Sequence, residues 1–148
     1  MVLSKNFTLL EFIRSNKADK LGIDNMPEQN FILSLMWLAQ FTLQPARDKF
    51  GRVDVTSGYR SKLLNIAING SKTSQHMEGQ ACDFRVPGKD LKEVFNWMKN
   101  NLIYGQIIYE APPGREPWIH VSLPRIGKAN QQALFYDGKT YKPIEGDL

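Results

Sequence analysis

The feature of the sequence that most constrains the fold is a change in the spacing of apolar residues near Arg52. Before this point apolar side chains recur every three to four residues, as Phe31, Leu35 and Leu38 do, and this spacing predicts a helix that faces a core. From Val53 onward apolar and polar residues alternate, which is typical of strands. Helices followed by strands favour an α+β domain in which helices pack on one side of an antiparallel sheet.

Capping residues and turn residues set the expected helices. Thr8-Leu9-Leu10-Glu11 has the spacing of a capping box, so a short helix is expected from there to about Ser15. Pro27 suits the first position of a longer helix, Pro45 should kink or end it, and Gly51 should stop it. Two further helices are expected over residues 61–68 and 90–102.

The second half of the chain is expected to supply the sheet. Strands are predicted over residues 53–56, 80–86, 104–110 and 118–123. After them, Asp137-Gly138 lies between apolar segments and predicts a β-hairpin. No repeat or linker divides the 148 residues, so we treat residues 1–148 as a single domain with one core.

Composition excludes several classes of protein. The single cysteine, Cys82, rules out an internal disulfide and a zinc finger built on cysteine pairs. The net charge of +4 comes from basic residues spread along the chain, which suits a polyanionic surface such as a bacterial wall better than a nucleic acid. No apolar segment suits membrane insertion, and the charged residues near the start do not fit a signal peptide.

Only two histidines occur, and both lie in segments that could hold a metal ion. His76 precedes Gly79 and a predicted strand that carries Asp83, so a loop that folds back could bring the two side chains together. His120, in a neighbouring strand, would then be a third ligand and leave a fourth tetrahedral position for water, as catalytic zinc requires. Two nitrogens and one oxygen favour one zinc ion. Cys82 alternates with Asp83 and should point to the opposite face, so it is not expected as a ligand.

Spacing alone leaves other interpretations open. A single histidine is more often hydrogen-bonded than bound to a metal, and an aspartate in a strand can simply pair with an arginine. The residues around His76 do not continue as His-Glu-x-x-His, and they lack the Pro-Cys-x-x-Cys of zinc deaminases. A metal-free protein is therefore an alternative at this point.

Four groups of residues follow one another in order between residues 6 and 122: Ser57-Gly58-Tyr59-Arg60-Ser61; Leu64-Asn65; Ser74-Gln75-His76 with Gly79, Ala81 and Asp83; and Trp118-Ile119-His120-Val121. Together they resemble the zinc D-alanyl-D-alanine carboxypeptidase family, and the short length resembles its phage or prophage branch. The resemblance implies the hedgehog-like fold of that family, with His76, Asp83 and His120 as zinc ligands. It also implies that Arg60 faces the carbonyl or carboxylate of the substrate and that Ser74 contacts the substrate peptide.

One position departs from the best-known pattern of that family, in which an acid or histidine three residues before the last zinc histidine handles protons. Here that position is Pro117, and two carboxylates could replace it, Glu110 and Glu116. We favour Glu110, because a hairpin register with Ile108 opposite His120 would place it on the same face as His120, about 7 to 8 Å away. A shift by one residue would turn Glu110 to the other face and favour Glu116. Without a catalytic role, Glu110 would be a solvated strand end.

Three further residues are candidate substrate contacts, each with a structural alternative. The planar guanidinium of Arg60 would bind a carboxylate or a developing oxyanion, and the alternative is a surface ion pair. Tyr59 and Trp118 could line the substrate groove or could be core aromatics. Their burial distinguishes between these interpretations.

The sequence therefore predicts a zinc-dependent peptidase that hydrolyses peptide bonds in the stem peptide of bacterial peptidoglycan, as a D,D-carboxypeptidase or as an endopeptidase of the endolysin type. The alternative is a non-catalytic wall-binding or virion structural module of the same fold, which Pro117 suggests. We expect one zinc ion, peptidoglycan as the partner, no nucleic acid, no membrane insertion and a monomer. Without a signal peptide, the protein should be made in the cytoplasm and reach the wall by phage-mediated release or in a virion.

Overall fold

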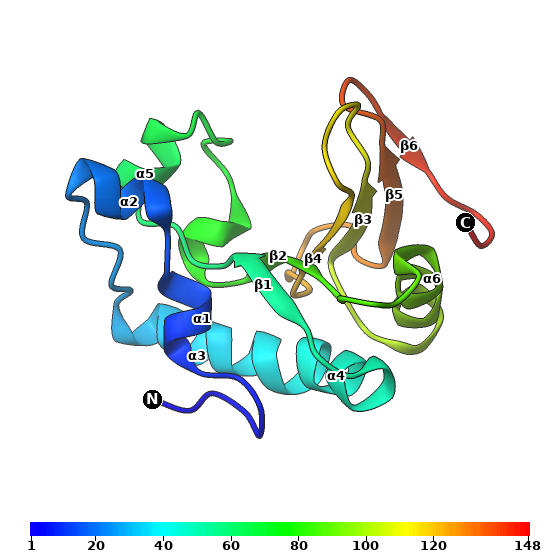
Figure 1. Cartoon of the computed structure of the whole chain (residues 1–148), viewed down its shortest axis with the longest axis horizontal. Helices are drawn as coiled ribbons and strands as arrows, with labels where there is room; N and C mark the ends of the chain where they lie inside the picture. Colours follow the sequence, from blue (N-terminus) through cyan, green and yellow to red (C-terminus); the bar gives the residue numbers. More distant parts are fainter.

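One sheet of six strands, in the order β1-β2-β4-β3-β5-β6, organises the computed structural model, which describes all 148 residues (Figure 1). The strands are β1 (Asp54–Ser57), β2 (Ala81–Arg85), β3 (Gln106–Glu110), β4 (Trp118–Ser122), β5 (Gln132–Tyr136) and β6 (Tyr141–Pro143). The α-helices are α1 (Leu9–Ile13), α2 (Asn16–Leu21), α3 (Gln29–Leu38), α4 (Gln44–Phe50), α5 (Lys62–Ala67) and α6 (Leu91–Asn101). A π-helix, η1 (Ala39–Leu43), joins α3 to α4, and a 3₁₀ helix, η2 (Gln75–Glu78), precedes β2. This is the α+β architecture that the sequence predicts.

The predicted strands β1 to β4 form within two residues of their expected ends, and the expected hairpin forms between β5 and β6. Its turn is held by Asp137, whose carboxylate accepts the N–H groups of Lys139 and Thr140 at 2.8 Å. Helix α2 was not expected from the sequence. Ser15, expected to lie at the end of the first helix, instead begins α2 by accepting the N–H of Ala18 at 3.2 Å. No helix has both the length and the apolar character needed to cross a membrane.

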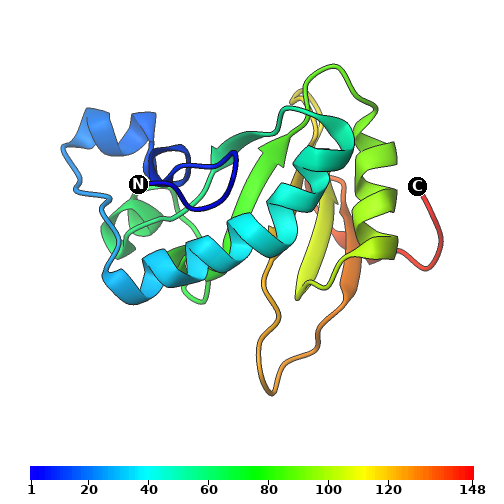
Figure 2. The same ribbon diagram turned by 90° about the horizontal axis from the view of Figure 1, so that it is seen from below.

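The longest helical segment consists of α3, η1 and α4, which follow one another without a break and lie along the sheet (Figure 2). Pro45 was expected to kink or end this segment, but the helix continues through it. The turn before it widens instead, and the N–H of Gln44 donates to the carbonyl of Ala39, five residues back. The wider turn accommodates a residue that has no N–H to donate to the preceding turn. Gly51, with φ of 92°, ends the segment as expected.

Four of the five strand pairs are antiparallel, as predicted, and the exception is the parallel pair of β3 and β5. β4 pairs with β2 on one edge and with β3 on the other, so neither edge is free for the strand that follows Ser122. The next strand joins the free edge of β3. Because it returns from β4, it runs in the same direction as β3.

The two faces of the sheet differ in character. On one face, Phe84, Ile119 and Tyr109 lie side by side on β2, β4 and β3 and belong to the hydrophobic core. The core also takes residues from α3, α4 and α6, so the larger helices pack on one side of the sheet as predicted. Since side chains alternate along a strand, Asp83 and His120 point to the other face. The candidate site therefore lies on the face that these helices leave open.

Candidate metal centre

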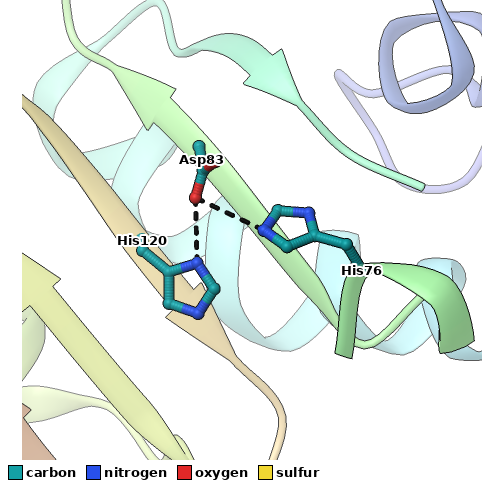
Figure 3. Close-up of side chains that lie close together, drawn as sticks. All are labelled: His76, Asp83 and His120. Atoms are coloured by element: carbon teal, nitrogen blue, oxygen red, sulfur yellow. Dashed lines mark hydrogen bonds and ion pairs between the residues drawn. The ribbon is translucent and has the colours of Figure 1, made fainter. Parts of the chain in front are cut away.

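Three side chains that the sequence analysis singled out converge on the open face of the sheet. Asp83 and His120 are direct cross-strand partners on β2 and β4, so both point to the same side. His76 comes from η2 and points toward Asp83 (Figure 3). His120 Nδ1 lies 2.9 Å and His76 Nε2 lies 3.5 Å from the same oxygen, Asp83 Oδ1. One donor atom from each residue lies within 4.8 Å of the other two, close enough to share one metal ion.

The turn that carries His76 is fixed at both ends. Ser74 begins it, and the Oγ of Ser74 accepts the N–H of His76 at 3.3 Å. Gly79 ends it with φ of 67°, in the left-handed region that favours glycine. A Cβ atom on Gly79 would lie only 2.5 Å from the carbonyl oxygen of Phe31. The turn can therefore approach α3 this closely only because residue 79 is glycine.

A hydrogen bond to the main chain sets which nitrogen of His76 carries a proton. His76 is 2% exposed, and its Nδ1 lies 2.7 Å from the carbonyl oxygen of Gly58. A carbonyl can only accept, so Nδ1 carries the hydrogen and Nε2 of the neutral ring presents a lone pair. Burial lowers the pKa of His76, although Asp83 opposes the shift, so the neutral ring is favoured at pH 7.

This tautomer makes the site fit a cation. At neutral pH the lone pair of His76 Nε2 faces Asp83 Oδ1, so two hydrogen-bond acceptors lie 3.5 Å apart in a largely buried place. Burial tends to raise the pKa of Asp83, but positive charge on the two imidazoles, when they are protonated, outweighs it and holds that pKa well below its usual range. An ionised carboxylate and an imidazole lone pair need a positive charge between them, which a divalent metal ion would provide.

The three donors lie in a cavity of about 620 Å³ that is mostly polar in its lining. Arg60, Ser74 and Glu110 line the same cavity, so three of the other residues selected from the sequence lie beside the candidate metal ligands. Cys82, as expected, is fully buried in the core on the opposite face, where burial raises the pKa of its thiol. It takes no part in the site.

Arg60 is tied to the metal centre through its main chain and through a neighbour. Its N–H donates to the carbonyl of His76 at 3.0 Å, and its Nη1 donates to Asn65 Oδ1 at 3.2 Å. No carboxylate forms an ion pair with it, so the alternative of a surface ion pair does not hold. Its Nε is buried without a partner. The guanidinium therefore retains donors for an anionic ligand in the cavity.

Glu110 lies where the expected hairpin register places it. Ile108 is opposite His120, as predicted, so Glu110 is on the same face as His120 and lines the cavity. Burial, together with the charge of Asp83, raises the pKa of Glu110 to about 7, although nearby cationic groups oppose the rise. An acid with this pKa can accept and return a proton near neutral pH. Glu110 is thus not a solvated strand end.

Glu116 lies apart from this cavity. Its side chain is 79% exposed, and its carboxylate lies 3.9 Å from the guanidinium of Arg85. No part of Glu116 lines the cavity that holds the metal ligands. The observed register therefore favours Glu110 over Glu116 as the acid beside the metal centre.

Neither aromatic candidate lines the cavity. Tyr59 is buried in the core and stacks on Phe31 with ring centroids 5.9 Å apart, so of its two interpretations the core aromatic is the one that fits. Trp118 is half-buried, with the guanidinium groups of Arg85 and Arg115 at 5.9 Å and 4.6 Å from its ring. The expected substrate contact therefore finds no support for Tyr59. Trp118 lies on the face of the sheet that carries His120, opposite Glu110, but does not line the cavity.

The cavity also contains, or depends on, residues to which the sequence analysis gave no role. Asn65 is buried and joins Arg60 to the loop after α5, because its Nδ2 donates to the carbonyl of Ser71 at 2.9 Å. The sequence signal that could have indicated a role for Asn65 is a polar residue at a buried position of a helix. Leu134 and Tyr141 line the cavity from β5 and β6. Their place depends on the parallel pairing of β5 with β3, which no local pattern indicates.

Two imidazoles and a carboxylate beside a second acid in a polar cavity suit hydrolysis that depends on a metal, and this is the class of protein that the fold and site define. Comparison with known families makes the class more specific. A family model described as peptidase M15 matches residues 5–122, and the chain belongs to this family of peptidases. The matched segment contains all three candidate metal ligands and ends with β4, so β5 and β6 lie beyond it. A search of curated proteins finds no match to the chain.

Proposed function

We propose that the protein is a zinc-dependent peptidase that hydrolyses peptide bonds in the stem peptide of bacterial peptidoglycan. The observation that carries the proposal is the convergence of His76, Asp83 and His120 in one cavity with Glu110 and Arg60. Membership of the peptidase M15 family supports peptide hydrolysis as the reaction. The resemblance of the ordered motifs to cell-wall peptidases supports the substrate.

Zinc is the metal that suits these donors. His76 Nε2, His120 Nδ1 and an oxygen of Asp83 would hold it, since two imidazole nitrogens and one carboxylate are a common catalytic zinc set. When bound, zinc supplies a Lewis acid that polarises the scissile carbonyl and makes water a nucleophile near neutral pH. The Gly58 carbonyl would keep His76 in the tautomer that can bind.

The remaining residues would move protons and hold the substrate. Glu110 would take a proton from the attacking water and return it to the leaving amine, which its pKa of about 7 allows. Arg60 would hold a carboxylate of the substrate or the oxygen that becomes negative during attack. Ser74, at the start of η2, would contact the substrate peptide. The net charge of +4 would favour approach to a polyanionic wall.

Two variants test the proposal together with metal analysis. The purified protein should contain about one zinc ion per chain and should release peptides of defined mass from purified peptidoglycan. His120→Ala should lose both zinc and hydrolysis, because it removes a ligand. Glu110→Gln should retain zinc and lose about 10²- to 10⁴-fold in rate, because it removes only the proton acceptor. Full activity in zinc-free protein would contradict the proposal.

A non-catalytic wall-binding module is the second candidate, and Pro117 at the usual proton-handling position is the observation that favours it. Such a module would take up zinc and bind peptidoglycan without hydrolysis at any pH. Glu110→Gln would then leave binding intact, so hydrolysis by the unsubstituted protein decides between the candidates. We further propose that the chain acts as a monomer and reaches the wall by phage-mediated release or in a virion.

A further inference from the structure

The open face of the sheet continues well past the metal centre. Asp83 and His120 lie on β2 and β4, and three more strands follow on one side in the order β3, β5 and β6. The register places Ile108, Leu134 and Pro143 in one row with His120 across these strands. Since neighbouring strands are about 4.8 Å apart, this row extends about 14 Å beyond His120. That length matches three to four residues of an extended peptide, at about 3.4 Å each.

The cavity follows this row across β3 and β5, and on β6 it is lined not by Pro143 but by Tyr141, which lies in the neighbouring row of Glu110 and Tyr136. Ile108 of β3 and Leu134 of β5 line it next to the metal ligands, and Tyr141 lines it from β6. Tyr141 is 56% exposed and stacks on Tyr136, with the ring centroids 4.4 Å apart. An apolar floor therefore leads from the metal centre to an exposed aromatic ring. Such a ring can cover a ligand without being needed for the core.

Two amides beside this floor suit a peptide backbone. Gln106 and Gln132 line the same cavity, and Gln106 Nε2 donates to Gln132 Oε1 at 3.1 Å. This bond uses one group of each side chain. The oxygen of Gln106 and the NH₂ group of Gln132 are left as one acceptor and one donor, which is what a peptide unit needs.

The two ends of the cavity lie at different parts of the fold. Arg60 lies next to His76, through its hydrogen bond to the carbonyl of that residue, while β5 and β6 lie on the far side of His120. Figure 1 shows α5 and the segment after it at one end of the molecule and the β5–β6 hairpin at the other. A substrate anchored at Arg60 and passing over the metal centre would thus have room to continue over the hairpin.

We propose that the β5–β6 hairpin is a substrate subsite that holds three to four residues on one side of the scissile bond, through Leu134, Tyr141 and the two glutamines. The enzyme then cleaves an internal bond of a peptide rather than only removing a terminal residue. This inference rests on the proposed peptidase function. The hairpin lies beyond the segment that matches the family, so membership of the family does not by itself imply the subsite.

Two synthetic peptides and one substitution test the subsite. The peptides share the scissile bond and everything on the side held by Arg60, and they carry either four residues or one residue on the other side. We expect the zinc-loaded protein to have a kcat/KM at least tenfold higher for the long peptide. Tyr141→Ala should lower the ratio of the two kcat/KM values about tenfold, as expected for the loss of one aromatic contact, and Tyr141→Phe should preserve it.

Lys142→Ala is the matched control, because Lys142 follows Tyr141 on β6, pairs with Phe135 and faces the other side of the sheet. It should leave the ratio as it is. Equal kcat/KM values for the two peptides, or a ratio that Tyr141→Ala does not change, would overturn the subsite while leaving the peptidase function intact.

Binding decides the question even without turnover. If the zinc-loaded protein hydrolyses neither peptide nor peptidoglycan, the proposed function fails, and the affinity of Glu110→Gln for the long peptide is measured by calorimetry with and without Tyr141→Ala. An affinity about tenfold weaker in the double variant supports the subsite. Equal affinities overturn it.

Discussion

Substituting Gly79 by alanine should lower the free energy of unfolding by more than the usual cost of placing a side chain in the left-handed region. The residue has φ of 67°, and a side chain in this region costs about 1–2 kcal/mol. In addition, the new Cβ would lie 2.5 Å from the carbonyl oxygen of Phe31, which belongs to the main chain of α3 and cannot rotate away. Relieving this contact requires η2 to move off α3, at a cost of about 1–3 kcal/mol.

Gly22 provides a matched control for this substitution. It also ends a helix in the left-handed region, with φ of 63°, but no atom lies within 4 Å of a Cβ built there. Gly22→Ala should therefore lower the free energy of unfolding only by the cost of the left-handed backbone, about 1–2 kcal/mol. Gly79→Ala should lower it by about 2–5 kcal/mol, because the contact with Phe31 adds to that cost. Urea unfolding of the two variants and the unsubstituted protein, in chelator, measures both values.

The same substitution should affect the metal centre, because η2 carries His76. If η2 moves, His76 Nε2 no longer lies 3.5 Å from Asp83 Oδ1, and zinc affinity should fall at least tenfold. Gly22→Ala should bind zinc as the unsubstituted protein does, since Gly22 follows the last residue of α2 and lies outside the site. Equal losses of stability in the two variants, with equal zinc affinities, would refute the argument that the contact with Phe31 holds the turn.

Three further predictions concern the ionisable and polar groups of the site. The pKa of Glu110 is raised to about 7 in the folded protein, against an ordinary 4.5. Between pH 4.5 and pH 7 the folded metal-free protein therefore binds more protons than the unfolded chain. The free energy of unfolding should thus fall as the pH rises from about 4.5 to 7. Allowing for partial solvent exposure, the loss is about 1–2 kcal/mol, and urea unfolding of Glu110→Gln should lack this component. In calorimetric scans, the Tm in chelator should be about 5–10 °C lower than the Tm at a free zinc concentration about 100-fold above the Kd. His120→Ala should show no such difference between the two conditions. Asn65→Ala should free the guanidinium of Arg60 and raise the KM for an anionic peptide several-fold. Zinc affinity, measured by calorimetry, should stay the same. A lower zinc affinity with an unchanged KM would contradict the role of Asn65 in positioning Arg60.

Local patterns were sufficient where each element depends on its own residues. The capping box at Thr8, the stop at Gly51 and the turn at Asp137 all act within four residues of themselves, and the structure contains each of them. The same is true of the register of β3 and β4, because a short connection and alternating apolar residues leave few alternatives. The position of Glu110 followed from this register.

Features that depend on distant segments could not be predicted in the same way. The parallel pairing of β5 with β3 depends on which sheet edges are free after β4 has paired, and no local residue encodes that. The burial of Tyr59 depends on Phe31, far away in the sequence. The tautomer of His76 depends on a carbonyl at Gly58, which has no sequence signal because every residue has a carbonyl.

The departure at Pro117 becomes intelligible from the contacts at the start of β4. Arg85, two residues after Asp83 on β2, donates through Nε to the carbonyl of Pro117 at 3.0 Å and through Nη2 to the carbonyl of Glu116 at 2.8 Å. Both hydrogen bonds are to main-chain oxygens, so holding the start of β4 to β2 requires no hydrogen bond to an acidic side chain. The acid of the site can then come from the end of β3, where pairing with β4 holds Glu110 on the same face as the metal ligands. In our proposal the proton-handling group has thus moved to the neighbouring strand, and its position depends on strand register rather than on its distance in sequence from His120.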